Sequence, residues 1–316
     1  MTTAPIVLFA YNRPLHLRRT LDALKANTLA KQSALFIYAD GLNPNATPEQ
    51  ASEVQAVRQL LDTLERDESH AFASIHITRQ ERNLGLADSI IQGVGEIMSR
   101  FGRAIILEDD ILTSPVFLAY MNDALNRYER ASKVWCIAAW SYPIETNGLG
   151  DSYFWRSPHC WGWASWADRW QHFRRDTQWA LDNFTKEDID YINLGGSARY
   201  FDQLIANHKG KIRTWAVYNY LIAYKHGALT LCPSTSYIKQ IGFDGSGVHC
   251  GEEGEVLNSA EVNTKFPITY PSEIIESSLA YERIRQFELS LRKPFFTRAV
   301  RKVSQLFFSI MKMRKA

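Results

Sequence analysis

Three consecutive acidic residues, Glu108-Asp109-Asp110, are the strongest candidates for chemistry in this sequence. They directly follow a short apolar segment, and adjacent carboxylates repel one another unless a cation joins them. Hard carboxylate oxygens suit Mg²⁺ or Mn²⁺, which proteins usually hold with one or two carboxylates together with substrate phosphates. If the segment is extended, one Asp could hold the metal while the other contacts a nucleotide sugar. The alternative is a solvated acidic turn before the next helix.

Polar residues also follow the other apolar segments of the first half. Arg13 could pair with a phosphate, or it could be a solvated charge at the start of a helix. Asp40 could accept hydrogen bonds from the N–H groups of a base, or it could be a turn residue before Gly41. Asn83 follows the third apolar segment. These residues become a site only if the fold brings them to one place.

The pattern of apolar residues predicts alternating strands and helices over the first 140 residues. We expect strands at 5–10, 35–38, 73–78, 104–107 and 134–139. Helices are expected to begin near residues 14, 48, 86 and 114, the second of them behind a capping box at 47–50. This order predicts an α/β fold with a mostly parallel sheet and helices on both faces. Ligands of such sheets bind beyond the carboxyl ends of the strands, where the polar residues above would gather.

Tryptophan is concentrated in the middle of the chain, with six of the nine between residues 155 and 179. Trp163, Trp166 and Trp170 have helical spacing, which favours a buried stripe on one helix over a ligand contact. Indole faces also pack against the C–H faces of sugars. The remaining candidates for sugar contact are Trp155, Trp161 and Trp215.

A glycine-rich segment at 242–249 could approach a phosphate closely and move. Within it, His249 is a candidate for contact with a metal or a diphosphate, although a lone His is as often structural. Asp244 in the same segment is the candidate catalytic base, since a general base must lie within hydrogen-bond reach of the hydroxyl whose proton it takes.

Together these motifs resemble the GT-A glycosyltransferases that use nucleotide sugars, and above all N-acetylglucosaminyltransferase I and its bacterial relatives. The resemblance runs from about residue 5 to residue 249. It rests on the ordered segments PIVLFAYNRP, YADG, NLGLADSI, AIILEDDILTSPVFLAYM, VWCIAAWS, CWGWASWADRW and IGFDGSGVHC.

The resemblance implies specific roles for several residues. The last Asp of the family's triplet binds the Mn²⁺ that bridges the donor diphosphate, which implies Asp110 here. Carboxylates at the ends of the second and fourth strands bind the uridine and the ribose, which implies Asp40, Glu108 and Asp109. An Arg after the first strand approaches the nucleotide, which implies Arg13, and a late loop, here 242–254, closes over the donor.

The function implied is an inverting transfer, dependent on Mn²⁺ or Mg²⁺, from a nucleoside-diphosphate sugar to a saccharide or lipid-linked glycan. A UDP-sugar is the favoured donor, the sugar is a hexose or an N-acetylhexosamine, and bacterial surface polysaccharide synthesis is the expected setting. One segment departs from the family: relatives carry an Asp beside a Trp as base, whereas this chain has Arg213-Thr214-Trp215-Ala216. If Asp244 is not the base, Asp202 or the pair Glu252-Glu253 are the next candidates.

The missing Asp leaves a second hypothesis open, a saccharide- or nucleotide-binding module that has lost its base. A nucleotidyltransferase is a third and weaker hypothesis, because it would be expected to have a glycine-rich basic loop after the first strand, and AYNRPLH has no glycine. A P-loop or dinucleotide-binding protein is not supported, since neither motif is present.

Composition limits the class of protein and its partners. A net charge of +2 argues against a general nucleic-acid binder, and no apolar run approaches the ~18 residues that span a bilayer. Four Cys residues without CxxC spacing fit a reduced, cytoplasmic protein. We expect a domain at 1–260, with a nucleotide-binding half at 1–140 and an acceptor half at 141–260, then a connecting segment at 261–291.

Residues 292–316 carry eight basic residues and no acidic one, with apolar residues at helical spacing. This pattern predicts a basic amphipathic helix that lies on an anionic membrane surface, at the inner face of the membrane. A helix docked on the protein's own sheet is the alternative.

Overall fold

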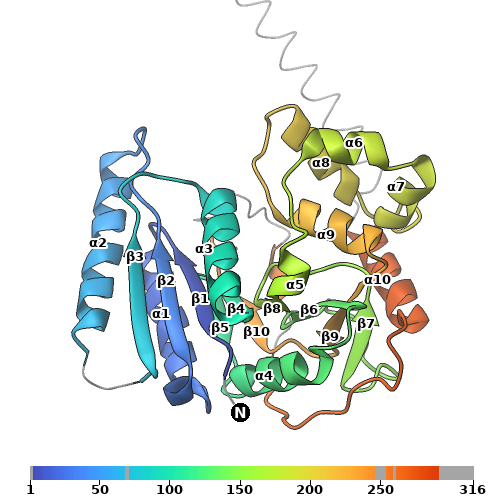
Figure 1. Ribbon diagram of the computed structural model, residues 1–316, viewed down its shortest axis with the longest axis horizontal. Coiled ribbons are helices and arrows are strands. Elements are labelled where there is room, and N and C mark those ends of the chain that lie inside the picture. Colours follow the sequence, from blue (N-terminus) through green and yellow to red (C-terminus); the bar gives the residue numbers. More distant parts are fainter. Residues whose placement is uncertain (1–2, 68–70, 246–253, 259–260, 292–316) are drawn as a thin grey trace, which may run out of the picture.

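The computed structural model describes residues 3–67, 71–245, 254–258 and 261–291 (Figure 1). Its elements follow in the order β1 (Ile6–Ala10), α1 (Pro14–Lys25), η1 (Ala30–Gln32), β2 (Ala34–Ala39), α2 (Pro48–Glu65), β3 (Ser74–Arg79), α3 (Leu86–Phe101), β4 (Arg103–Glu108), β5 (Ile111–Thr113), α4 (Phe117–Tyr128), β6 (Val134–Ala138), β7 (Ser152–Trp155), β8 (Trp163–Trp166), α5 (Ala167–Trp170), α6 (Thr177–Asn183), α7 (Lys186–Ile192), α8 (Tyr200–His208), α9 (Ala216–Lys225), β9 (Leu229–Pro233), β10 (Ile238–Gln240), η2 (Gly254–Leu257) and α10 (Ser278–Ser290).

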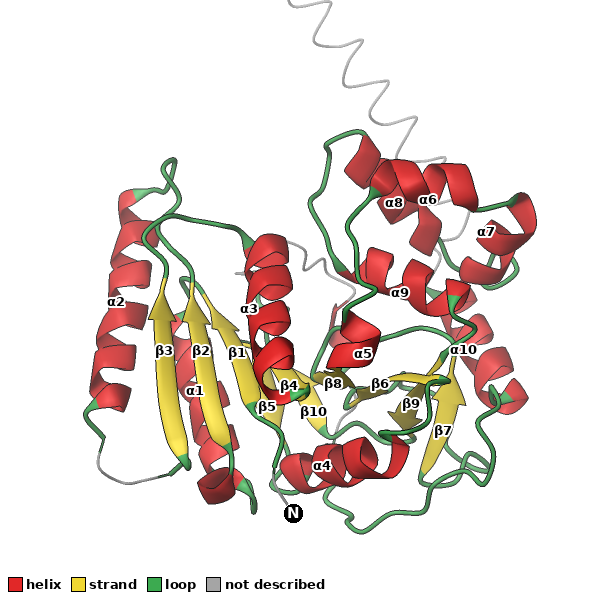
Figure 2. Cartoon of the chain, in the orientation of Figure 1, coloured by secondary structure: helices red, strands yellow, loops and turns green. Residues whose placement is uncertain are grey.

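The centre of the fold is an eight-stranded sheet in the order β3-β2-β1-β4-β8-β6-β9-β7. Strands β3, β2, β1 and β4 are parallel, and β6 and β9 are parallel to each other. Only β8 and β7 run against their neighbours. Helices cover both faces of this mostly parallel sheet (Figure 2), which confirms the GT-A-like α/β architecture expected from the sequence.

The alternation of side chains along β1 explains how both faces are covered. Ile6 and Leu8 are buried with the apolar residues of α1, α2 and α4. Val7 and Phe9 point to the opposite face and are buried with those of α3. Because successive side chains of a strand point to opposite faces, a continuous apolar run such as β1 is what a doubly covered strand requires. The carboxyl end of this buried strand is therefore held rigidly.

The predicted strands and helices of the first half are confirmed, with boundaries that differ by a few residues. The helix α2 begins behind the expected capping box, in which Thr47 accepts a hydrogen bond from the Gln50 amide and the Gln50 side chain accepts one from the Thr47 amide. The predicted elements therefore position the strand ends as the sequence implied.

The helical stripe expected for Trp163, Trp166 and Trp170 is wrong. Residues 163–166 form strand β8, which lies antiparallel between β4 and β6. Trp163 and Trp166 point to opposite faces of the sheet, and Trp170 lies on the short helix that follows, with its ring centroid 5.5 Å from that of Trp163. Large aromatic side chains fit either a helix or a strand, so a spacing of three residues over so short a segment did not identify the element.

A second sheet of two strands joins parts of the chain that are distant in sequence. Strand β5 follows the acidic triplet directly and pairs antiparallel with β10, with Ile111 opposite Gln240. The amide of Ile241 donates to the Asp110 carbonyl over 2.9 Å, which continues this pairing. This small sheet therefore carries the start of the glycine-rich segment to the end of β4.

The described part of the C-terminal region packs against the sheet. Helix α10 buries Ala280 and Ile284, and it is capped by the Ser277 side chain. No helix within the described ranges is long and apolar enough to cross a membrane. The predicted amphipathic helix at 292–316 lies outside the described residues, and the division of the chain into domains stays a prediction.

Cys136, Cys160 and Cys232 are free thiols.

Candidate functional site at the carboxyl ends of β1 and β4

The acidic triplet and Arg13 meet where β1 and β4 end. The guanidinium of Arg13 pairs with the Asp109 carboxylate, and its Nη1 lies 2.8 Å from Asp110 Oδ2. The side chains of both Asp residues are 4% exposed and that of Arg13 is 16% exposed, so this is a buried cluster of charges. The two Asp side chains do not alternate as in a strand, because residues 109 and 110 form a turn between β4 and β5. The structure thus brings together the predicted residues Arg13, Asp109 and Asp110.

One carboxylate oxygen of this cluster has no hydrogen-bond partner among the described residues. Asp110 Oδ1 is buried and makes no hydrogen bond with any described residue. A Cβ atom built on Gly242 would collide with the Asp110 carboxylate and with the Arg13 guanidinium. The absence of a side chain at Gly242 therefore lets the loop after β10 pass directly over the cluster of Arg13, Asp109 and Asp110, which we call the corner.

The donor set fits a hard divalent cation. A buried carboxylate oxygen without a hydrogen-bond donor is costly unless a ligand contacts it. Within the described ranges, no three His, Cys, Asp or Glu side chains converge to form a complete metal cage. Mg²⁺ and Mn²⁺ suit this corner, because such ions take one or two protein carboxylates and fill their remaining positions with water and substrate phosphates.

The pKa values of Glu108 and Asp109 also indicate that Arg13 alone does not balance the negative charge of the three acidic residues. Burial raises the pKa of Glu108 to about 8, and the carboxylates of Asp110 and Asp109 add to this shift. Burial likewise raises the pKa of Asp109 to about 6, against the opposing effect of Arg13. The carboxylates raise the pKa of Arg13 above its ordinary value although burial opposes this. The three carboxyl groups can carry more negative charge than Arg13 neutralises. A metal cation would therefore bind favourably beside Arg13.

Asp40 and Asn83 form a neighbouring cluster at the ends of β2 and β3. Asp40 is buried, and its carboxylate accepts hydrogen bonds from the amides of Gly41, Leu84 and Gly85 and from Asn83 Nδ2, at 2.8 to 3.0 Å. Asn83 also donates to the Gly41 carbonyl over 2.9 Å. The structure therefore gives Asp40 the turn role that the sequence left open, because it fixes the loop before α3. Its contact with a base stays a prediction.

Replacing Asp40 with Ala is expected to cost at least about 2 kcal/mol of unfolding free energy, because several buried amides lose their acceptor. Urea unfolding would measure this loss. The matched control is Asp22→Ala, which changes an exposed carboxylate on α1 and should shift stability by less than about 0.5 kcal/mol. Equal stability of the two variants would contradict the structural role of Asp40.

The candidate base Asp244 lies two residues after Gly242, which covers the charge cluster, and its side chain is half exposed. Its carboxylate is 3.1 Å from Nε2 of His16, and the same nitrogen is 3.2 Å from the carbonyl oxygen of Ile241. The sequence analysis missed His16. The signal was available, because His16 lies in the first turn of α1, only three residues after Arg13, which is the N-cap of this helix. The other candidate in this loop, His249, lies outside the described residues.

The aromatic candidates for sugar contact separate into two groups. Trp155 is fully buried in β7, and Trp215 is buried against Trp163 with ring centroids 5.3 Å apart. Both are core residues, so the prediction of sugar contact is wrong for them. Trp161 is only partly buried, and its ring meets that of Phe243 edge to face at 5.6 Å. Trp161 is thus the member of the set that lies at the glycine-rich loop.

The segment beside Trp215 carries no carboxylate in the position expected from relatives. Arg213 forms an ion pair with Asp88, in the first turn of α3, and Ala216 begins α9. This ion pair connects the segment to the first turn of α3, the helix that follows the loop held by Asp40. A cation paired with an acid thus lies where relatives are expected to have a base.

Of the comparisons with known proteins, the match to a protein family includes the residues of the site. Comparison with curated proteins finds no match. Among solved structures, a crystal structure of S. aureus TarS is similar over 44% of this chain, with 11% identity and a TM-score of 0.30, and the match spans 22% of the TarS chain. A model described as the GNT-I family matches residues 1–174, which include Arg13, Asp40 and the acidic triplet. Because this match covers more than half of the 316 residues, the chain belongs to the GNT-I family, as its motifs had indicated.

Proposed function

We propose that this protein is a metal-dependent, inverting glycosyltransferase that moves a sugar from a nucleoside-diphosphate sugar to a saccharide or lipid-linked glycan. The observation that carries the proposal is the buried Asp110 oxygen at the end of β4, which has no hydrogen-bond partner among the described residues. It lies within a cluster of charges that a single Arg neutralises only in part. Membership of the GNT-I family supports the same activity. A UDP-sugar donor is the version that the resemblance favours.

In this proposal the residues of the corner and the neighbouring residues Asp40 and Asn83 have separate roles in donor binding. Asp110 would hold Mn²⁺ or Mg²⁺, and the ion would neutralise charge on the diphosphate that leaves. Arg13 keeps the two Asp carboxylates in place and lies within the same corner. Asp40 and Asn83 hold the loop that begins α3, so this loop presents a fixed surface to the nucleoside.

The acceptor side is formed by Trp161 and Phe243. Their edge-to-face contact places an apolar surface at the start of the glycine-rich loop, and indole faces bind the C–H faces of sugars. A lipid-linked acceptor at an anionic membrane is also part of the proposal, supported by the basic composition of residues 292–316. Inversion needs a base that takes the proton of the acceptor hydroxyl while its oxygen bonds to the anomeric carbon and the diphosphate leaves.

Asp244→Asn is expected to lower turnover at least ~100-fold with little change in donor affinity, since loss of a general base affects the transition state and not donor binding. Steady-state rates and calorimetry of donor binding measure the two effects. His16→Gln, which keeps a polar side chain next to Asp244, serves as the matched control and should cost much less. Near-normal turnover in Asp244→Asn would direct attention to Asp202 or to Glu252 and Glu253.

The activity can be tested without knowing the acceptor. Purified protein is incubated with a panel of nucleotide sugars, with Mn²⁺, with Mg²⁺ or with EDTA, and the released nucleoside diphosphate is measured. We expect slow hydrolysis of one donor class that EDTA abolishes. Equal release with EDTA would contradict metal dependence.

A binding module that has lost its base is the second candidate. The ion pair of Arg213 with Asp88 favours it, because no free carboxylate lies at the position expected from relatives. The module predicts metal-dependent binding of the donor without hydrolysis or transfer. The donor panel combined with calorimetry therefore separates the two functions.

A further inference from the structure

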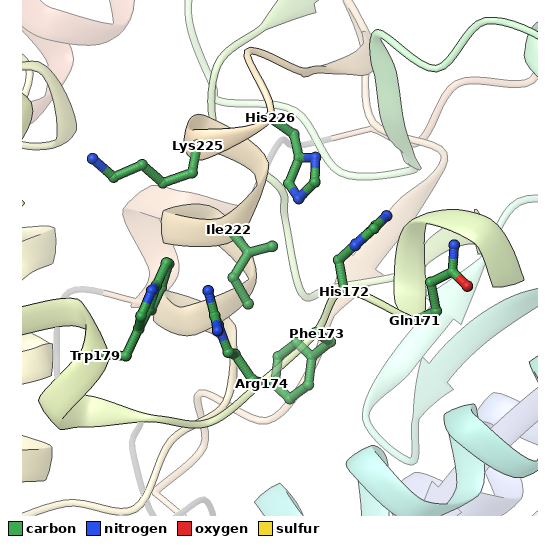
Figure 3. Close-up of a pocket in the computed structure, with 8 residues that line it drawn as sticks. All are labelled: Gln171, His172, Phe173, Arg174, Trp179, Ile222, Lys225 and His226. Carbon is green, nitrogen blue, oxygen red and sulfur yellow. The ribbon is translucent and has the colours of Figure 1, made fainter. Parts of the chain in front are cut away.

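A pocket of about 360 Å³ lies away from the charge cluster, between the segment that follows α5 and the C-terminal part of α9 (Figure 3). Its lining residues are Gln171, His172, Phe173, Arg174, Trp179, Ile222, Lys225 and His226. Figure 3 shows Ile222 at the centre of this group, with Arg174 and Trp179 on one side of it and His226 and His172 on the other. Pockets of this volume accept small-molecule groups.

The lining has an excess of positive charge. Two of its residues are permanent cations, two are His, and none of the eight is acidic. Lys225 is paired with Asp188 at 2.9 Å, whereas Arg174 forms no ion pair with any described carboxylate. The Arg174 guanidinium lies 3.8 Å from the centre of the Trp179 ring. An aromatic ring that holds a guanidinium in place leaves its N–H edges available for a planar or tetrahedral anion.

The two histidines add to this concentration of donors. The ring centroids of His172 and His226 are 4.4 Å apart, and the His226 ring lies 5.3 Å from that of Trp135. Burial lowers the pKa of His226, and the neighbouring His172 and Arg174 lower it further. Positive groups placed this close oppose one another, and an anion between them would remove that cost.

We propose that this pocket binds a phosphate or diphosphate group, with Arg174 as the principal anchor and His172, His226 and Gln171 as further donors. Lys225 lies in the last turn of α9, at the negative end of the helix dipole, and it pairs with Asp188, which accounts for this cation without a ligand. Arg174 lies in the loop between α5 and α6, so the dipole of α9 does not explain its positive charge in the pocket.

The pocket is separate from the proposed donor site. Arg213, just before α9, reaches Asp88 at the donor side, whereas the pocket lies at the other end of this ten-residue helix, about 15 Å away along its axis. The inference therefore does not depend on the proposed transfer reaction, and it can be tested by binding alone.

The test is a titration of the metal-free protein with inorganic pyrophosphate in EDTA, followed by calorimetry and by the imidazole NMR signals of His172 and His226. The wild-type protein should bind with both signals shifting. Arg174→Gln should weaken binding at least about tenfold, as expected when a charge-assisted contact is lost. Lys31→Gln, which removes an exposed cation on η1, should bind as the wild type does. His226→Gln provides a second variant and should also weaken binding.

Two further arms identify the source of the phosphate. One uses a sugar 1-phosphate in solution, and the other uses neutral vesicles with and without a lipid diphosphate. Binding to either that requires Arg174 supports the site and assigns its ligand to that class. No binding of pyrophosphate, or binding that Arg174→Gln leaves unchanged, would overturn the proposal.

Discussion

Replacing Asp110 with Ala is expected to remove metal-dependent binding of a nucleoside diphosphate, with a loss of affinity of at least ~100-fold. Changes to groups that merely support a metal ligand cost 10–100-fold in general, so loss of the ligand itself should cost at least the upper end of that range. The reason lies in the geometry, because Asp110 Oδ1 is a buried carboxylate oxygen that receives no hydrogen bond from any described residue. Calorimetry of UDP with Mn²⁺ measures the effect.

The fold should survive this change. Among the described residues, the Asp110 side chain forms an ion pair with Arg13 alone, and Asp109 keeps that residue in place. Circular dichroism should therefore be unchanged. Asp182→Ala, which alters an exposed carboxylate on α6, is the matched control and should bind like the wild type. Wild-type affinity in Asp110→Ala would mean that the ion, if one binds, is held elsewhere.

Replacing Arg13 with Gln is expected to destabilise the metal-free protein by about 3 kcal/mol, because breaking a buried ion pair leaves an uncompensated charge. Arg13 is the cation that contacts both Asp109 and Asp110, and both carboxylates are almost fully buried. Urea unfolding in EDTA measures the loss. Mn²⁺ should restore part of the lost stability, since an ion that binds only the folded state stabilises it by mass action.

The control for Arg13→Gln is Arg19→Gln in α1, the helix that follows Arg13, where the side chain is exposed. That change should alter stability by less than about 0.5 kcal/mol and should show no dependence on Mn²⁺. If the two variants unfold alike, the carboxylates do not need Arg13, and the account of the charge cluster fails.

The first half of the fold could be predicted because its signals are local. The buried strand β1, the helix α1 that begins at Pro14 and the capping box before α2 each show in a few consecutive residues. Strand β8 could not be predicted, because its place between β4 and β6 depends on pairing with strands that are distant in sequence. It pairs with residues 103–106 of β4 and with residues 137–138 of β6. Aromatic residues at a spacing of three suggested a helix where long-range pairing imposed a strand.

In the candidate site, too, the features with local sequence signals could be predicted and those set by long-range pairing could not. Arg13, Asp109 and Asp110 were predictable, because each follows a strand whose carboxyl end lies at one edge of the sheet. The arrival of Gly242 over Asp110 depends on β5 pairing with β10, which no local pattern reveals. The turn role of Asp40 also depends on contacts with a loop more than 40 residues later.

The most direct measurement for the central claim is a crystal structure of the protein with UDP and Mn²⁺, in which anomalous scattering locates the ion. The account predicts one Mn²⁺ bound to Asp110 at about 2.0–2.2 Å, with its other ligands taken from the diphosphate and water, and with the nucleoside toward Asp40 and Asn83. An ion bound by other residues, or UDP bound at this corner with Asp110 still lacking a ligand, would contradict it.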